Sequence, residues 1–163
     1  MSQSDTAPVL TYVPQPTDPA LQLPEGACDA HVHVFGPAAQ FPFSPRRNIT
    51  PVDAPKETLF ALHRRLGISR CVIVQSVVHG QDNAVVEDAL RAGGRRYLGV
   101  ALVPVNVADT ELRRLSRAGF RGVRFNFMKH LSDAVDAEQV IALTARLKSV
   151  GMHLQVHFDS VLV

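Results

Sequence analysis

The sequence predicts an α/β fold, an incomplete barrel of the TIM type with about five parallel strands and four helices. Three observations support this prediction. From Asp53 onward, strand-like and helix-like segments alternate. Several strands combine one apolar face with one polar face. No G-x-G-x-x-G loop follows the first strand, which weakens the alternative of a dinucleotide-binding doubly wound sheet.

The first 26 residues differ in character from the rest of the chain. They contain Pro8, Pro14, Pro16, Pro19 and Pro24 but few large apolar residues. This composition is typical of an extended arm rather than of a folded domain. We therefore assign residues 1–26 to a proline-rich N-terminal arm and residues 27–163 to the N-terminal part of the barrel.

The first strand is expected within "ACDAHVHVFG", residues 27–36. Successive side chains of a strand point to opposite faces, so Asp29, His31, His33 and Phe35 should share one side. Two imidazoles about 6 to 7 Å apart could aim their nitrogens at a metal ion or at a reacting carbonyl. They could equally be ordinary core or surface histidines. A long loop rich in proline follows.

The rest of the chain predicts four helices and four further strands. Aspartates are candidate caps at the starts of the second to fourth helices (Asp82, Asp109 and Asp136), and a glycine follows each helix. The helices are expected at 55–67, 82–94, 109–119 and 136–151, and the strands at 71–76, 97–103, 122–127 and 153–159. Parallel strands joined by helical crossovers account for this spacing.

The faces of the later strands favour a barrel over an open sheet. Val123 and Phe125 alternate with Arg124 and Asn126, whereas a parallel sheet covered on both sides is usually apolar on both faces. In a barrel, the apolar face meets the helices and the polar groups converge at the carboxyl ends of the strands. Arg124 is then a candidate for binding a carboxylate bidentately, or else for an internal ion pair with Asp29 or Asp159. Lys129 and His130 follow in the next loop and could extend such a site.

Composition excludes several function classes. The net charge is only +2, and the arginine pairs fall on or near predicted helices, so nucleic-acid binding is not expected. No apolar run is long enough for a membrane span and no signal-peptide pattern is present, which predicts a cytoplasmic protein. The two cysteines, Cys28 and Cys71, are expected to be unpaired and to behave as small hydrophobic residues.

Three segments, "CDAHVHVFGPAAQFPFSP", "VIVQSVVHGQDN" and "GFRGVRFNFMKHL", resemble the amidohydrolase superfamily. The similarity is to the branch of the 2-pyrone-4,6-dicarboxylate lactonases and 4-sulfomuconolactone hydrolases. It implies the N-terminal half of a (β/α)8 barrel that hydrolyses an anionic lactone, dicarboxylate or sulfonated, in aromatic-compound degradation. It also implies that His31 and His33 are catalytic. A further histidine and a catalytic aspartate are expected from later strands that this sequence lacks, so the chain alone should hydrolyse poorly or not at all.

The resemblance leaves the cofactor open, because the branch contains members with a divalent ion such as zinc and members without one. If a metal is used, His31 and His33 are its expected ligands. Substrate contacts are expected from residues on the polar faces and mouth loops, namely Gln75, Ser76, His79, Arg124, Asn126, Lys129, His130 and His157. Dicarboxylate lactonases show arginine at the position of His130 and tyrosine at that of His157. These departures put 2-pyrone-4,6-dicarboxylate itself in doubt, but not the class of anionic lactones.

Two alternatives stay open. One is a metal-dependent decarboxylase of the same superfamily, which would also use the two histidines and an arginine. The other is a truncated barrel half without catalytic activity. In either case the open barrel edge favours self-association, because an unpaired parallel edge exposes its hydrogen-bonding groups.

Overall fold

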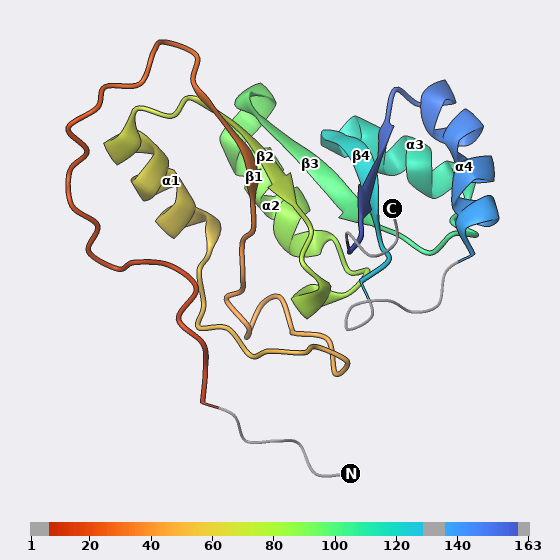
Figure 1. The fold of residues 1–163 in the computed structure, drawn as a ribbon, viewed down its shortest axis with the longest axis horizontal. Helices are drawn as coiled ribbons and strands as arrows, with labels where there is room; N and C mark the ends of the chain where they lie inside the picture. The colour runs from red at the N-terminus through yellow and green to blue at the C-terminus, as the bar shows by residue number, and fades with distance from the viewer. Residues whose placement is uncertain (1–6, 129–135, 160–163) are drawn as a thin grey trace.

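A computed structural model describes residues 7–128 and 136–159, and these form one sheet backed by helices (Figure 1). All strand pairs are parallel, and the order in the sheet, β1-β2-β3-β4-β5, is the order along the chain. The strands are β1 (Cys28–Val32), β2 (Arg70–Val74), β3 (Tyr97–Leu102), β4 (Phe120–Asn126) and β5 (His153–His157).

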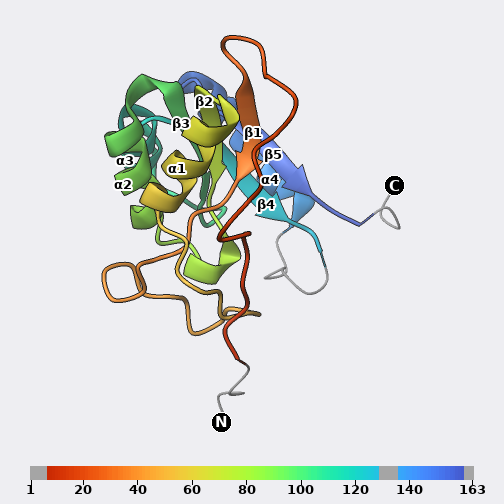
Figure 2. The ribbon, with the colours of Figure 1, turned by 90° about the vertical axis from the view of Figure 1, so that its left-hand side faces the viewer.

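The helices occupy the crossovers between consecutive strands. They are α1 (Lys56–Leu66), α2 (Ala84–Gly93), α3 (Asp109–Ala118) and α4 (Ala137–Ser149), with short 3₁₀ helices η1 (Val77–His79) and η2 (Gly94–Arg96). Figure 2 shows α1, α2 and α3 together on one side of the sheet. A doubly wound sheet would reverse its strand order and carry helices on both faces. The predicted barrel fold, present as a curled half with five strands, is therefore confirmed.

Most helix ends lie where the sequence predicts them. Gly67 ends α1 in the left-handed conformation at φ 72°, and Asp136 caps α4 by accepting a hydrogen bond from the Glu138 N–H. The predicted cap at Asp109 is wrong. Ala108 takes the extended cap conformation instead, and the Asp109 carboxylate forms an ion pair with Arg146.

The core lies between the sheet and the helices. Val123 and Phe125 of β4 belong to it, as predicted, together with the fully buried Phe120. The apolar face of β5 is different, since Val156 and Phe158 are 45% and 48% exposed. Within the described residues no helix follows β5, and β1 and β5 each pair on one side only.

Strand β1 does not alternate regularly. Its register with β2 shifts between Asp29 and Val32. Because the shift adds a residue, Val32 packs against the core and Asp29 is turned toward α1, where it contacts His63. The prediction that Asp29 shares a side with His31 and His33 is therefore wrong. The bulge separates the carboxylate from the two imidazoles.

The N-terminal arm is described from residue 7 and folds back along α1 (Figure 1). It is held by a bridge between Val9 and Pro51 and by an ion pair between Asp18 and Arg65. None of the described helices combines the length and the apolar character needed to cross a membrane.

Candidate functional site

A buried arginine lies at the centre of the candidate site. Arg124 is on the face of β4 opposite the core and is 9% exposed. Its guanidinium donates to His31 Nε2 at 3.3 Å and to His157 Nδ1 at 2.5 Å. Residues from the first, fourth and fifth strands therefore meet at one point, as the barrel interpretation predicts.

Asn126 completes this cluster from the same strand. Its Oδ1 accepts a hydrogen bond from Arg124 Nε at 3.0 Å and lies 3.1 Å from His157 Nδ1. Residues two positions apart on a strand point to the same face, so the side chains of Arg124 and Asn126 lie together on β4 and hold each other in place. The guanidinium is held in one orientation before any ligand is bound.

The two histidines of the first strand lie edge to face, with ring centroids 5.3 Å apart. His33 Nδ1 donates to the Val74 carbonyl at 2.7 Å, which leaves a lone pair on Nε2. His31 Nε2 accepts from Arg124, so neutral His31 carries its proton on Nδ1. The Val74 carbonyl was not predicted from the sequence, because its role depends on the pairing of β1 with β2.

Electrostatics keep both imidazoles neutral. Burial and the positive charge of Arg124 lower the pKa of His31, and Asp29 only partly opposes them. Burial is also the main reason that the pKa of His33 is lowered, with the hydrogen bond to Val74 acting in the opposite direction. Burial lowers the pKa of Arg124 as well, but a guanidinium stays protonated in proteins.

Arg124 has no carboxylate partner among the described residues. None of their ion pairs includes it, and Asp29 pairs with His63 instead. The alternative of an internal ion pair with Asp29 or Asp159 is therefore wrong. A buried cation bonded only to neutral groups is an incomplete arrangement that an anionic ligand would complete.

The described residues fit a metal less well at this point. His31 and His33 would supply two donors, whereas zinc sites in proteins use three or four protein ligands. The nitrogen of His31 that faces the cluster already accepts a hydrogen bond from a cation. A metal at these histidines would need further protein ligands and would have to displace Arg124 from His31 Nε2.

The predicted residues of the second mouth loop have different surroundings. Gln75 is buried and its amide donates to the carbonyls of Gly80 and Asp82. His79 is also buried, between the Gly36 N–H and the Pro42 carbonyl. Ser76 accepts a hydrogen bond from the Val78 N–H at the start of η1. These three side chains are thus engaged with backbone atoms of the loops, while Lys129 and His130 lie outside the described residues.

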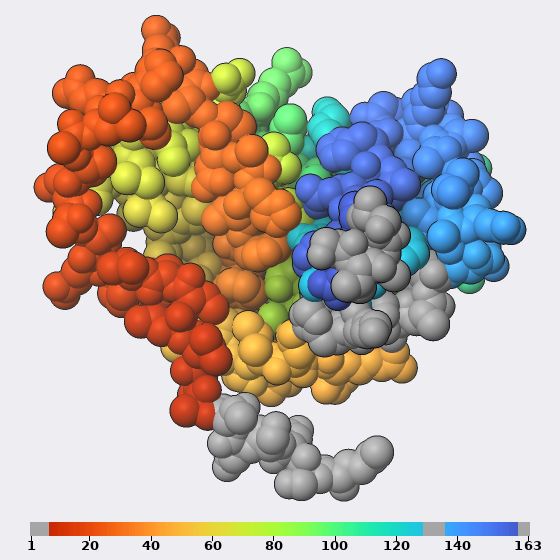
Figure 3. All heavy atoms as spheres, in the orientation of Figure 1, coloured from red at the N-terminus to blue at the C-terminus, as the bar shows by residue number. Residues whose placement is uncertain are grey.

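A cavity of about 930 Å³ adjoins the site. It is bordered by the arm around Tyr12 and Val13, by α1, and by His31 and His33. Figure 3 shows the arm, in red and orange, beside the yellow atoms of α1. His31 is shared by this cavity and by the Arg124 cluster, so the site opens toward the free edge of β1.

Acidification is expected to destabilise the fold through His79. Burial lowers the pKa of His79 below 6.5, although the Pro42 carbonyl and the charges of Asp82 and Asp53 oppose this shift. Protonation would also put a second donor where Nε2 now accepts from the Gly36 N–H. The unfolded chain binds more protons, so the free energy of unfolding should fall as the pH drops from about 7 to about 5. Urea titrations across this range measure the effect, and His79→Gln should make the fall shallower. An equal slope in the variant would contradict this assignment.

The family of the chain follows from a comparison with known proteins. A family model described as Amidohydrolase matches residues 28–162. The chain belongs to the amidohydrolase family. The match begins at the first residue of β1 and includes every strand of the sheet, so the resemblance expected from the three sequence segments is confirmed.

Individual amidohydrolase relatives carry names of lactone hydrolases. The chain is 43% identical over 162 residues to a 2-pyrone-4,6-dicarboxylate hydrolase of Comamonas testosteroni, covering 99% of this chain and 53% of that protein. It is 43% identical over 137 residues to a 4-sulfomuconolactone hydrolase of Rhizobium radiobacter, covering 83% and 46%. A solved 2-pyrone-4,6-dicarboxylic acid hydrolase of Pseudomonas putida superposes with a TM-score of 0.67 at 31% identity, covering 83% and 50%. The chain therefore spans about half the length of these relatives.

Proposed function

We propose that this chain supplies the anion-binding and carbonyl-polarising half of a cytoplasmic lactone hydrolase. The substrate is a dicarboxylate or sulfonated lactone from the breakdown of aromatic compounds. The observation that carries the proposal is the buried Arg124 guanidinium, bonded to His31, His157 and Asn126 and free of any carboxylate partner within the described residues. The names of the relatives support the same substrate class.

Each group has a distinct part in this proposal. Arg124 holds the carboxylate or sulfonate of the substrate through charge-assisted hydrogen bonds. The Nδ1–H of neutral His31 donates to the lactone carbonyl oxygen, where negative charge develops as water attacks. The hydrogen bond from His33 Nδ1 to Val74 leaves a lone pair on Nε2, which can accept a hydrogen bond from the attacking water. Gln75 and His79 position the surrounding loops.

Water attack also needs a strong proton acceptor. The resemblance to the family leads us to expect this acceptor to be an aspartate from a later strand, which the present sequence does not include. We therefore expect the 163-residue chain to bind anionic lactones but to open them slowly. Within the described residues, β1 and β5 each have one unpaired edge. Such edges favour association with a further polypeptide, and self-association through them is part of this proposal.

Calorimetric titration of the chain tests the proposal. 2-Pyrone-4,6-dicarboxylate should bind at least about tenfold more tightly than uncharged 2-pyrone, because only the former offers a partner to Arg124. Equal affinity for the two ligands would overturn it. The reaction itself is followed by the loss of lactone absorbance, and release of carbon dioxide without ring opening would indicate a decarboxylase instead.

A further inference from the structure

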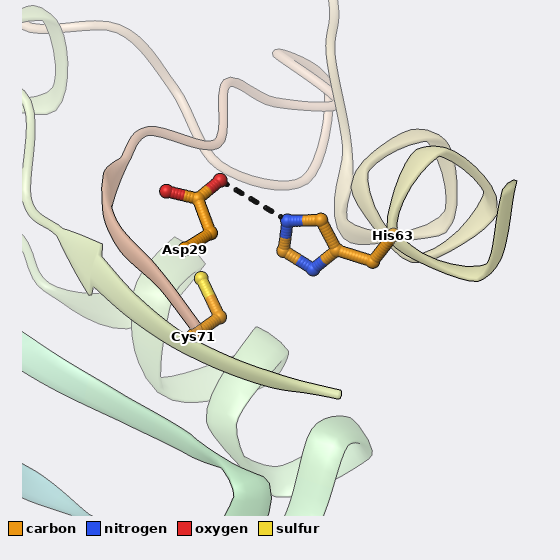
Figure 4. Close-up of side chains that lie close together, drawn as sticks. All are labelled: Asp29, His63 and Cys71. Carbon is orange, nitrogen blue, oxygen red and sulfur yellow. Dashed lines mark hydrogen bonds and ion pairs between the residues drawn. The ribbon is translucent and has the colours of Figure 1, made fainter. Parts of the chain in front are cut away.

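A second polar cluster, made of side chains of the kinds that can bind metals, lies on the opposite face of the sheet from the Arg124 cluster. It consists of Asp29 on β1, His63 on α1 and Cys71 on β2, whose ligand atoms all lie within 4.8 Å of one another (Figure 4). We propose that these three residues bind a zinc-like divalent ion that ties α1 to the first two strands. This proposal is independent of the proposed hydrolase function.

The geometry is close to that of a tetrahedral site. Zinc bonds of about 2.0 to 2.1 Å to nitrogen and oxygen hold those two atoms about 3.3 Å apart, and a sulfur bond of about 2.3 Å places sulfur about 3.5 Å from each. His63 Nε2 and Asp29 Oδ2 are already 3.2 Å apart. The sulfur therefore needs to move by up to about 1.4 Å, which rotation of the Cys71 side chain together with a shift of the partly exposed Asp29 side chain can supply.

A hydrogen bond to Tyr97 holds the imidazole of His63 in position. Its Nδ1 is 2.9 Å from the Tyr97 hydroxyl, so the ring is held with Nε2 directed at Asp29. Metal-binding histidines usually have such a partner on their second nitrogen. A hydroxyl can accept as well as donate, so it can receive the Nδ1 proton when Nε2 binds a metal.

The hydrogen bonds alone do not explain the third member. They link Asp29, His63 and Tyr97. The Cys71 sulfur lies beside the carboxylate and the imidazole but takes part in neither of these hydrogen bonds. A nitrogen, an oxygen and a sulfur donor together are the set that zinc prefers over magnesium or calcium.

The cluster is accessible from solvent, and metal binding has to displace one thiol proton. Cys71 and His63 are each 1% exposed, whereas the Asp29 side chain is 26% exposed and provides a route from solvent. Burial raises the pKa of the Cys71 thiol to about 12, so the sulfur is protonated before the metal arrives. As the metal–sulfur bond forms, the thiol proton passes to solvent and the ring proton of His63 moves from Nε2 to Nδ1. A water on the side of Asp29 can fill the fourth position.

Cobalt titration of the 163-residue chain tests the site, because cobalt bound to a thiolate gives a near-ultraviolet charge-transfer band that imidazole or carboxylate ligation does not give. We expect this band in the unmodified chain. It should be lost in Cys71→Ser and retained in Cys28→Ser, whose sulfur is exposed. It should also be retained in the double variant His31→Ala/His33→Ala. Absence of the band in the unmodified chain, or its loss in Cys28→Ser, would overturn the proposal.

Zinc affinity gives a second readout if Cys71→Ser does not fold, as judged by circular dichroism. Competition with a chromophoric chelator should show that Tyr97→Phe, which removes only the partner of His63 Nδ1, weakens zinc binding by about tenfold or more. Asp29→Asn, at a partly exposed position, should weaken it further. Unchanged zinc affinity in both folded variants would contradict the site.

Discussion

Replacing Arg124 with methionine is expected to weaken the binding of an anionic lactone by about 1.5 to 3 kcal/mol, or about 10- to 150-fold in Kd. Methionine has a similar length but no charge and no N–H donors. The hydrogen bonds to His31 and His157 that orient the guanidinium show that its geometry is set before binding. The loss should therefore appear as reduced affinity, measured by calorimetric titration with 2-pyrone-4,6-dicarboxylate.

The same strand offers a matched control. Arg121 is exposed and donates to the carbonyls of Ser116 and Phe120 on the outer side of the sheet. Arg121→Met should leave the affinity unchanged. Arg124→Lys should restore only part of the binding, because an ammonium cannot form the planar bidentate contact. If both methionine variants bind equally well, Arg124 does not contact the anion.

Replacing Phe120 with alanine is expected to lower the free energy of unfolding by about 3 to 5 kcal/mol. Phe120 has no exposed surface and lies against Gly99 and Leu90, at the contact between β3, β4 and α2. Gly99 leaves just enough space for the ring, since a Cβ there would lie 2.6 Å from it. Deletion of the ring leaves a cavity, because Gly99 has no side chain to fill it and Leu90 is held in place on α2. Urea unfolding followed by circular dichroism measures the change.

Phe158→Ala is the control for this effect. It removes the same side chain from the end of the sheet, where Phe158 is 48% exposed. The free energy of unfolding should then change by about 0.5 kcal/mol or less. A loss as large as that of Phe120→Ala would mean that Phe158 is covered in solution, as association through β5 would require.

The fold could be predicted largely because its signals are local. Apolar residues at helical spacing, a glycine after α1 and an aspartate before α4 act within a few residues of themselves, and the structure agrees with them. Asp109 shows the limit of such signals. Whether a residue caps a helix depends on its backbone conformation, and the extended conformation belongs to Ala108. The Asp109 carboxylate is instead directed to Arg146, far along the chain.

The site was predictable where a strand alternates regularly and not where it is distorted. Arg124 and Asn126 follow from the pattern of β4 alone. The bulge in β1 arises from pairing with β2, so the sequence around Asp29 contains no local sign of it. The hydrogen bonds of the Gln75 amide nitrogen to carbonyls of the following loop could not be predicted either, because they depend on how that loop folds back. Because the bulge places Asp29 and His31 on different faces of the sheet, the two residues belong to two distinct polar clusters.

The agreement between strand order and chain order affects how the polypeptide can fold during translation. Each strand from β2 onward pairs with the strand synthesised just before it, and α2, α3 and α4 each contact the strand that follows them in the chain. Nascent chain emerging from the ribosome can therefore extend the sheet one unit at a time, without waiting for distant segments. When the sheet grows strand by strand in this way, Arg124 reaches His31 only after β4 has been added, so the anion-binding cluster forms late.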